Sequence, residues 1–178
     1  EMRAFNLEVS KKCAVLLKNK DNTLPLNKSA LKTIGVIGPN ADNIIMQRGN
    51  YSGTPTKEHE CSILDAIRQA AEGIDVTYCK ACNHVTEQTE GVADFDSLAV
   101  AVSDCDAIIV VTGLTARLEG EEMRVTYEGF YGGDRTKIEL PSIQQDLVKA
   151  MHATGKKVIV VNCSGSAIGF GEIEQDYD

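Results

Sequence analysis

The sequence lacks the features that are typical of membrane-spanning proteins and of nucleic-acid-binding proteins. No apolar run approaches the roughly 20 residues that a membrane-spanning helix needs, so we expect no membrane span. Lysine and arginine form no cluster beyond the pairs Lys11-Lys12 and Lys156-Lys157, and the formal net charge is −8 over 178 residues. Because such an acidic chain repels phosphate backbones, we expect no nucleic-acid partner.

The sequence also lacks a complete metal or nucleotide motif. Cys79 and Cys82 form a C-x-x-C pair, but no second pair and no His-x-x-x-His follows, and His84 alone does not complete a zinc site. The glycines around residue 38 do not extend to G-x-G-x-x-G, and Pro39 removes an N–H that a phosphate would need. We therefore expect no metal and no cofactor. A disulfide between Cys61 and Cys82 stays open as an alternative.

The sequence does contain an alternation of predicted helices and strands within a length that fits one domain. Apolar residues recur with a helical period over the segments 2–13, 62–71, 94–102 and 141–154. Short apolar runs between turn signals predict strands over the segments 14–19, 32–37, 74–78, 107–111 and 158–161. Ser62 and Asp94 are expected N-caps, and Pro141 fits the first turn of its helix.

This alternation predicts an α/β fold, a three-layer sandwich in which helices cover both faces of a mostly parallel sheet in a flavodoxin-like arrangement. In such sheets ligands bind outside the carboxyl ends of the strands. The loops that follow Ile37, Val111 and Val161 should therefore emerge at one edge of the sheet.

The connection at residues 113–140 follows one of these strands and is rich in glycine and acidic residues, without apolar periodicity. Connections this long are uncommon in a compact domain and are usually functional or disordered. From these residues alone, a solvated surface loop is the more ordinary interpretation. The expected position at the carboxyl edge favours a functional one, because carboxylates are the usual acid–base groups for sugars.

Several motifs, in this order and at this spacing, make the chain resemble the carboxyl-terminal α/β sandwich domain of glycoside hydrolase family 3. The resemblance runs from the first predicted helix to Asn162–Gly165, nearly the whole chain, and we therefore expect residues 1–178 to be a fragment of this domain. The motifs are Val15–Asn19, Leu24–Leu26, Ile37–Ala41, Gly49–Gly53, Cys82, Gly113-Leu114, Gly133–Arg135, Leu140-Pro141, Gln144 and Asn162–Gly165. The Gly-Asn-Tyr loop and the segment Leu118–Glu122 are most similar to the β-xylosidase and related β-glucosidase branch.

The resemblance implies one half of a retaining, exo-acting β-glycosidase that acts on terminal β-linked sugars of plant-type oligosaccharides. In this family the nucleophile is an aspartate on an N-terminal (β/α)8 barrel, and the acid/base is a glutamate on the second domain. Retention requires the two carboxyl groups about 5–5.5 Å apart, which only the docked domains provide. Because this chain contains no barrel, we expect the isolated chain to be inactive.

Three neighbouring glutamates are candidates for the acid/base. Glu121 is favoured because Gly120-Glu121 matches the Gly-Glu that lies upstream of Gly-Asp-Arg in many family β-glucosidases. Glu119 is the main rival because Glu119-Gly120-Glu121 matches the Glu-x-Glu of xylosidase-like members. Glu122 ranks third and is also a candidate substrate contact.

Two further residues are candidate substrate contacts. Tyr51, between glycines, offers a ring on which a sugar can stack, and Arg117 offers a cation for a hydroxyl or a barrel carboxylate. We expect Asp134 and Arg135 to be structural, as an ion pair or as a clamp on the loop.

The resemblance also implies the partners and the compartment. We expect the barrel domain of the same polypeptide and an oligosaccharide as partners, and a periplasmic or secreted parent protein. The N-terminus itself has no signal-peptide pattern. Family members usually continue beyond the last predicted strand with further sheet, so we expect a truncated sandwich whose uncovered edge invites a homodimer. The alternatives are a non-catalytic α/β carbohydrate- or partner-binding module and a nucleotide or signalling domain, which the Gly-Pro-Asn after the first strand disfavours.

Overall fold

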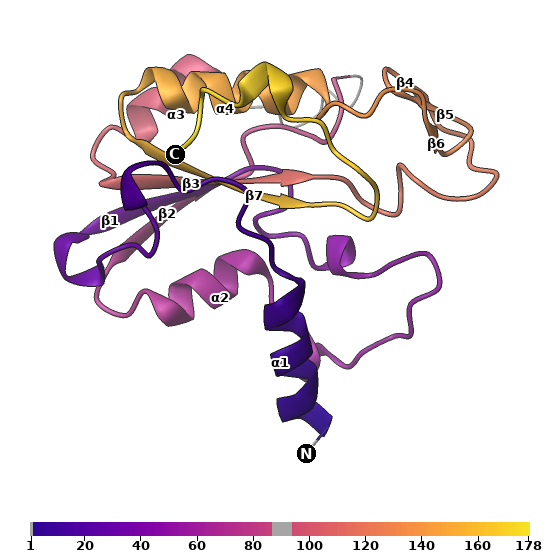
Figure 1. The fold of residues 1–178 in the computed structure, drawn as a ribbon, viewed down its shortest axis with the longest axis horizontal. Helices are drawn as coiled ribbons and strands as arrows, with labels where there is room; N and C mark the ends of the chain where they lie inside the picture. The colour runs from indigo at the N-terminus through magenta and orange to yellow at the C-terminus, as the bar shows by residue number, and fades with distance from the viewer. Residues whose placement is uncertain (1, 87–93) are drawn as a thin grey trace.

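Four parallel strands form the central sheet of the molecule (Figure 1). The strand order is β2-β1-β3-β7. These strands are β1 (Thr33–Ile37), β2 (Asp75–Cys79), β3 (Ala107–Gly113) and β7 (Lys157–Cys163). The computed structural model describes residues 2–86 and 94–178. Between the predicted strand that ends at residue 78 and the helix that begins at residue 94, the sequence also predicts a polar loop over residues 83–93, and this loop lies partly outside the described residues. The α/β fold with a parallel sheet is confirmed.

Helices cover both faces of this sheet, as the alternation predicts. The helix α2 (Ile63–Ala70) lies against one face, and α3 (Phe95–Ala101) and α4 (Ser142–Ala153) lie against the other (Figure 1). Successive side chains of a strand point to opposite faces. In β3, Ile108 packs into the core with α3 and α4, whereas Ile109 packs into the core with α2. The continuous apolar run of β3 therefore fills two cores at once.

The helix starts follow the local sequence closely. The Ser62 hydroxyl accepts a hydrogen bond from the Asp65 N–H at 3.1 Å, and the Asp94 carboxylate accepts one from the Asp96 N–H at 3.1 Å. Both predicted N-caps are confirmed. Pro141 lies one position earlier than expected, because its extended ψ of 140° makes it the N-cap of α4.

The N-terminal segment differs from the expectation. The predicted helix forms as α1 (Met2–Cys13), but none of its residues is buried, and it points away from the sheet (Figure 1). The strand predicted over residues 14–19 is wrong, because the segment has no regular secondary structure. Val15 and Leu17 are 75% and 71% exposed, and the apolar run lines a cavity beside the edge strand β7 without pairing with it.

The acidic connection is more ordered than its sequence indicates. It contains the short antiparallel strands β4 (Thr126–Tyr127), β5 (Phe130–Tyr131) and β6 (Asp134–Arg135). Beneath them lies a separate apolar cluster formed by Val85, Leu114, Leu118, Val125 and Phe130. We call this cluster the loop core. It gives residues 113–140 a fixed shape beside the sheet (Figure 1).

The remaining regular elements are short 3-10 helices at Lys20–Asn22, Lys28–Ala30, Ile44–Gln47, Lys57–His59 and Gly171–Ile173. Within the part of the chain that the structure describes, no helix has the length and apolar character that crossing a membrane requires.

Candidate active site

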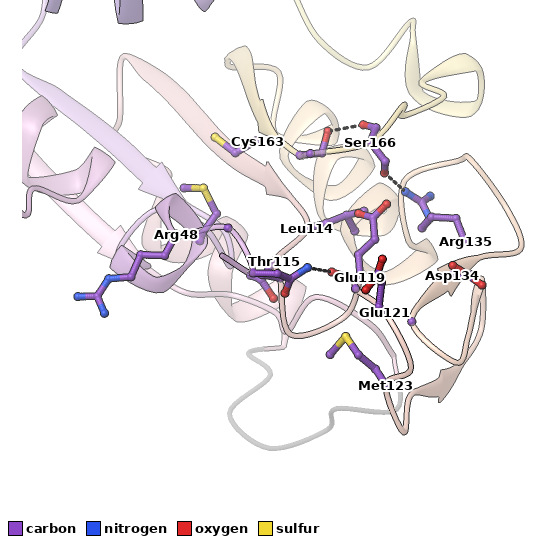
Figure 2. A pocket seen from close by; sticks show the side chains of 18 of the residues that line it. Arg48, Leu114, Thr115, Glu119, Glu121, Met123, Asp134, Arg135, Cys163 and Ser166 are labelled. Atoms are coloured by element: carbon purple, nitrogen blue, oxygen red, sulfur yellow. Dashed lines mark hydrogen bonds between the residues drawn. The ribbon is translucent and has the colours of Figure 1, made fainter. Parts of the chain in front are cut away.

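A cavity of about 1320 Å³ opens at the carboxyl edge of the sheet (Figure 2). Its lining comes from the loop after β1, the connection after β3 and the segment after β7. The predicted convergence of these three loops at one edge is therefore confirmed. The parallel direction of the strands is the physical reason, because it places all their carboxyl ends together.

A buried glutamine fixes the rim of the cavity where β3 ends. The Gln144 amide donates to the Gly113 carbonyl and to the His84 carbonyl, both at 2.9 Å, and its Oε1 accepts from the Gly113 N–H at 2.8 Å. Gly113 has a φ of 125°, and a Cβ there would lie 1.8 Å from the Cys163 carbonyl oxygen. Only glycine fits this close approach of β3 to β7.

A second buried amide holds the loop after β1. The Asn40 Nδ2 donates to the carbonyls of Thr112 and Leu114 at 3.2 and 3.4 Å, and its Oδ1 pairs with the His84 Nε2 at 2.8 Å. Burial, with a smaller effect of Lys80, lowers the pKa of His84 to about 4. The imidazole is therefore neutral at pH 7 and donates its Nε2–H to Asn40.

The two favoured glutamates both line the cavity. Glu119 is half-buried and Glu121 is exposed, and Figure 2 shows both side chains beside the cavity between Thr115 and Arg135. The Tyr51 hydroxyl donates a hydrogen bond to the Glu121 Oε2 at 3.3 Å. The structure thus brings Tyr51, Glu119 and Glu121 together, although Tyr51 comes from a different loop.

Arg135 clamps the connection and lies near Glu119. Its guanidinium donates to the Ser166 Oγ at 3.3 Å and to the Glu139 carbonyl at 2.9 Å, and it lies 5.1 Å from the centre of the Phe130 ring. Burial lowers the pKa of Arg135, whereas the charges of Glu119 and Glu139 raise it. Among the described residues Arg135 forms no ion pair, so the clamp interpretation is favoured over a pair with Asp134.

The other predicted contacts are placed less centrally. Tyr51 is 91% exposed and presents its ring to solvent at the cavity. Arg117 and Glu122 are exposed on the acidic connection, but they lie outside the lining that the described residues form. Sequence reasoning did not single out Asn50 or Ser166, although Asn50 lies within the marked segment Gly49–Gly53 and Ser166 directly follows the marked segment Asn162–Gly165.

The family model of the glycosyl hydrolase family 3 C-terminal domain matches residues 14–177. The chain belongs to this family. It is 34% identical, over 99% of its length, to a β-xylosidase of Formosa agariphila, and 29% identical, over 96%, to a periplasmic β-glucosidase of Salmonella typhimurium. A solved family 3 exo-β-xylosidase in complex with a xylobiose aziridine activity-based probe superposes with a TM-score of 0.79 at 31% identity over 98% of this chain.

The family 3 domain is only part of the length of these relatives. It spans 23% of the Formosa β-xylosidase, 23% of the Salmonella β-glucosidase and 20% of the solved exo-β-xylosidase chain.

The cysteines of the family 3 domain are all free thiols in the structure, so the possible Cys61–Cys82 disulfide is not formed. Cys82 is fully buried, and burial raises its pKa to about 12, which makes it an unreactive part of the core. No group of three or more His, Cys, Asp or Glu side chains suited to a metal ion occurs among the described residues.

Proposed function

We propose that this domain supplies the acid/base of a retaining, exo-acting β-glycosidase, a β-xylosidase or β-glucosidase that hydrolyses terminal β-linked sugars of plant-type oligosaccharides. The observation that carries the proposal is a pair of glutamates, Glu119 and Glu121, at a cavity on the carboxyl edge of the sheet. The names of the family relatives, β-xylosidase and β-glucosidase, support the substrate class.

Glu121 is the proposed acid/base. Its carboxylate contacts a neutral hydroxyl, that of Tyr51, and this hydroxyl can donate to the ionised carboxylate or accept from the protonated acid. The contact therefore persists through both steps of a retaining reaction, in which the same group is first acid and then base. Glu119 instead lies near the guanidinium of Arg135. A cationic neighbour of this kind suits a residue that orders the loop.

The proposed partner is the N-terminal (β/α)8 barrel of the same polypeptide, which supplies the nucleophile. Two features support a docked partner. The relatives are about four to five times longer than this chain, because it spans 23% and 20% of them. The N-terminal segment also exposes large apolar side chains on α1 and after it, including Met2, Phe5 and Leu16. Several large apolar side chains exposed in one segment are typical of an interface. A second copy of the chain is the alternative occupant.

A periplasmic or secreted location of the parent protein is part of the same proposal, and the naming of the Salmonella relative as periplasmic supports it. Cell fractionation of the parent would test it, since recovery of the full-length protein with cytoplasmic markers contradicts an exported enzyme.

The second candidate function is a non-catalytic carbohydrate-binding module. The exposed Tyr51 ring at a polar cavity favours it, because aromatic faces and hydroxyl-bearing neighbours such as Ser164 and Ser166 are suited to bind sugars. This alternative predicts sugar binding without any contribution of the glutamates to turnover.

The deciding experiment compares Glu121→Gln and Glu119→Gln in the full-length parent with aryl β-xylosides and β-glucosides. Loss of a general acid costs about 10²–10⁴-fold when the leaving group is poor, and far less when it is activated. We expect this pattern for Glu121→Gln, and we expect added azide to restore part of the lost turnover rate. The same pattern in Glu119→Gln would move the role to Glu119. Full activity of both variants would favour the binding module, and turnover by the isolated chain would contradict the need for a barrel.

A further inference from the structure

The loop between β1 and α2, residues 43–61, reaches across the cavity to the acidic connection. It makes two side-chain contacts there. The Asn50 Nδ2 donates to the Glu119 carbonyl at 3.0 Å, and the Tyr51 hydroxyl donates to the Glu121 Oε2 at 3.3 Å. Asn50 therefore holds the backbone of the segment that leads to Glu121, and the next residue, Tyr51, holds the carboxylate of Glu121 itself.

The contact of Asn50 depends on a close approach at Gly120. A Cβ on Gly120 would lie 2.7 Å from the Asn50 Nδ2 and 3.1 Å from its Cγ, so glycine provides the space that the amide occupies. On the other side, the Gly120 N–H donates to the Gly133 carbonyl at 3.1 Å. A Cβ on Gly133 would lie 1.9 Å from the Gly120 carbonyl oxygen. The peptide group that joins Glu119 to Gly120 is thus hydrogen-bonded by Asn50 at its carbonyl and by Gly133 at its N–H.

The base of the 43–61 loop is held by contacts within the loop itself. Arg48 and Glu60 form an ion pair across the loop, and the Gln47 Nε2 donates to the Cys61 carbonyl at 2.6 Å. The Arg48 side chain points away from the other labelled cavity residues (Figure 2). Arg48 therefore stabilises the loop on which Asn50 and Tyr51 lie.

We propose that Asn50 is a positioning residue for proton transfer by Glu121, because its amide fixes the Glu119–Gly120 peptide and so sets the direction of the Glu121 carboxyl. This proposal rests on the proposed role of Glu121 as acid/base. Asn50 acts through the Glu119 backbone and needs no contact with the sugar. Small displacements of a catalytic group reduce rates strongly, since proton transfer requires hydrogen-bond geometry.

The test uses Asn50→Ala, the near-isosteric Asn50→Asp and Gly120→Ala in the full-length parent, each assayed with phenyl and with 2,4-dinitrophenyl glycosides. Asn50→Ala removes the amide, and Asn50→Asp replaces the donor by an acceptor that faces the Glu119 carbonyl. Gly120→Ala places a Cβ where the amide lies, at a φ that alanine tolerates. Matched controls are Asn27→Ala, remote from the cavity, and Gly53→Ala on the same loop, where a Cβ meets no atom within 4 Å.

For all three variants we expect kcat to fall about tenfold with the phenyl glycoside and less than about twofold with the dinitrophenyl glycoside, with little change in KM. The double variant Asn50→Ala/Gly120→Ala should lose no more than Asn50→Ala, because both lesions break one contact. Hydrogen exchange of residues 118–123 should accelerate in Asn50→Ala, while both control variants match the parent.

Equal losses on both glycosides would overturn the proposal, since they would show a general effect on structure. Unchanged kinetics would overturn it as well, even if hydrogen exchange accelerates. The Glu121→Gln variant separates the two levels. If it shows the leaving-group dependence and Asn50→Ala does not, the positioning role alone falls. If Glu121→Gln shows none, the acid/base assignment falls and the positioning role falls with it.

Discussion

The sheet and the acidic connection are both well ordered, but different interactions order them. In β3 every residue is buried, and hydrogen-bonded neighbours on both sides define its register. The connection has strands of only two residues, and its shape depends on the loop core and on contacts from the 43–61 loop. The sheet thus positions the acidic connection, which depends on contacts from other loops for its shape and which bears the candidate acid. Binding residues are often arranged in this way, on loops that a rigid scaffold positions.

The largest effect should come from the core of the sheet. Leu147 of α4 is fully buried with Val110 and Val158, so Leu147→Ala should lower the free energy of unfolding by about 3 kcal/mol, through lost burial and a residual cavity. Urea denaturation measures this change. The control is Leu7→Ala on the exposed helix α1, for which we expect almost no change. A loss below about 1 kcal/mol in Leu147→Ala would show that the core relaxes around the cavity.

The second effect concerns the junction between the sheet and the connection, where His84 is buried beside Asn40. The pKa of His84 is about 4 in the folded chain, below the value near 6.5 expected when unfolded. Between these values the unfolded chain binds the proton and the folded chain does not, so stability falls as pH falls from 6.5 to 4, by up to about 3 kcal/mol. Unfolding measured across this range should show the slope, and His84→Gln should remove this component. An identical slope in both proteins would assign the pH dependence to other groups.

The smallest effect on the sheet should come from the loop core. Leu118→Ala removes a side chain from the loop core, whose buried members all lie outside β1, β2, β3 and β7, so unfolding of the sheet should change by less than about 1 kcal/mol. Hydrogen exchange of residues 115–135 should accelerate strongly, because the connection opens by itself. If Leu118→Ala instead lowers the stability of the whole chain as much as Leu147→Ala does, the two regions unfold together and the distinction drawn above is wrong.

Local sequence patterns predicted the elements that neighbouring residues stabilise. The helix caps at Ser62 and Asp94 follow from the preference of a hydroxyl or carboxylate for the free N–H groups of the first turn. The same kind of pattern was misleading at residues 14–19, where an apolar run lies beside β7 but forms no strand. It also missed β4, β5 and β6, since two-residue strands leave no periodicity that a sequence could show.

The candidate site also combines a feature that a local motif indicated with contacts that no local motif could indicate. The motif Gly120-Glu121 made Glu121 the favoured candidate, but the motif does not show which residue faces it. The contacts of Asn50 and Tyr51 join positions about 70 apart in the sequence, as the separations of 69 and 70 residues show. Asn50 and Tyr51 are too far from Glu121 in the sequence for a local pattern to reveal these contacts.

The sequence by itself determined the alternation of strands and helices, the burial of both faces of the sheet and the edge at which the loops meet. Those features depend on neighbouring residues and on the fixed geometry of parallel strands. Only the tertiary structure decided that the acidic connection has its own apolar core, that Arg135 clamps it and that Asn50 and Tyr51 hold the segment around Glu121. Such contacts form between distant parts of the chain, so they exist only once the sheet has brought the loops together.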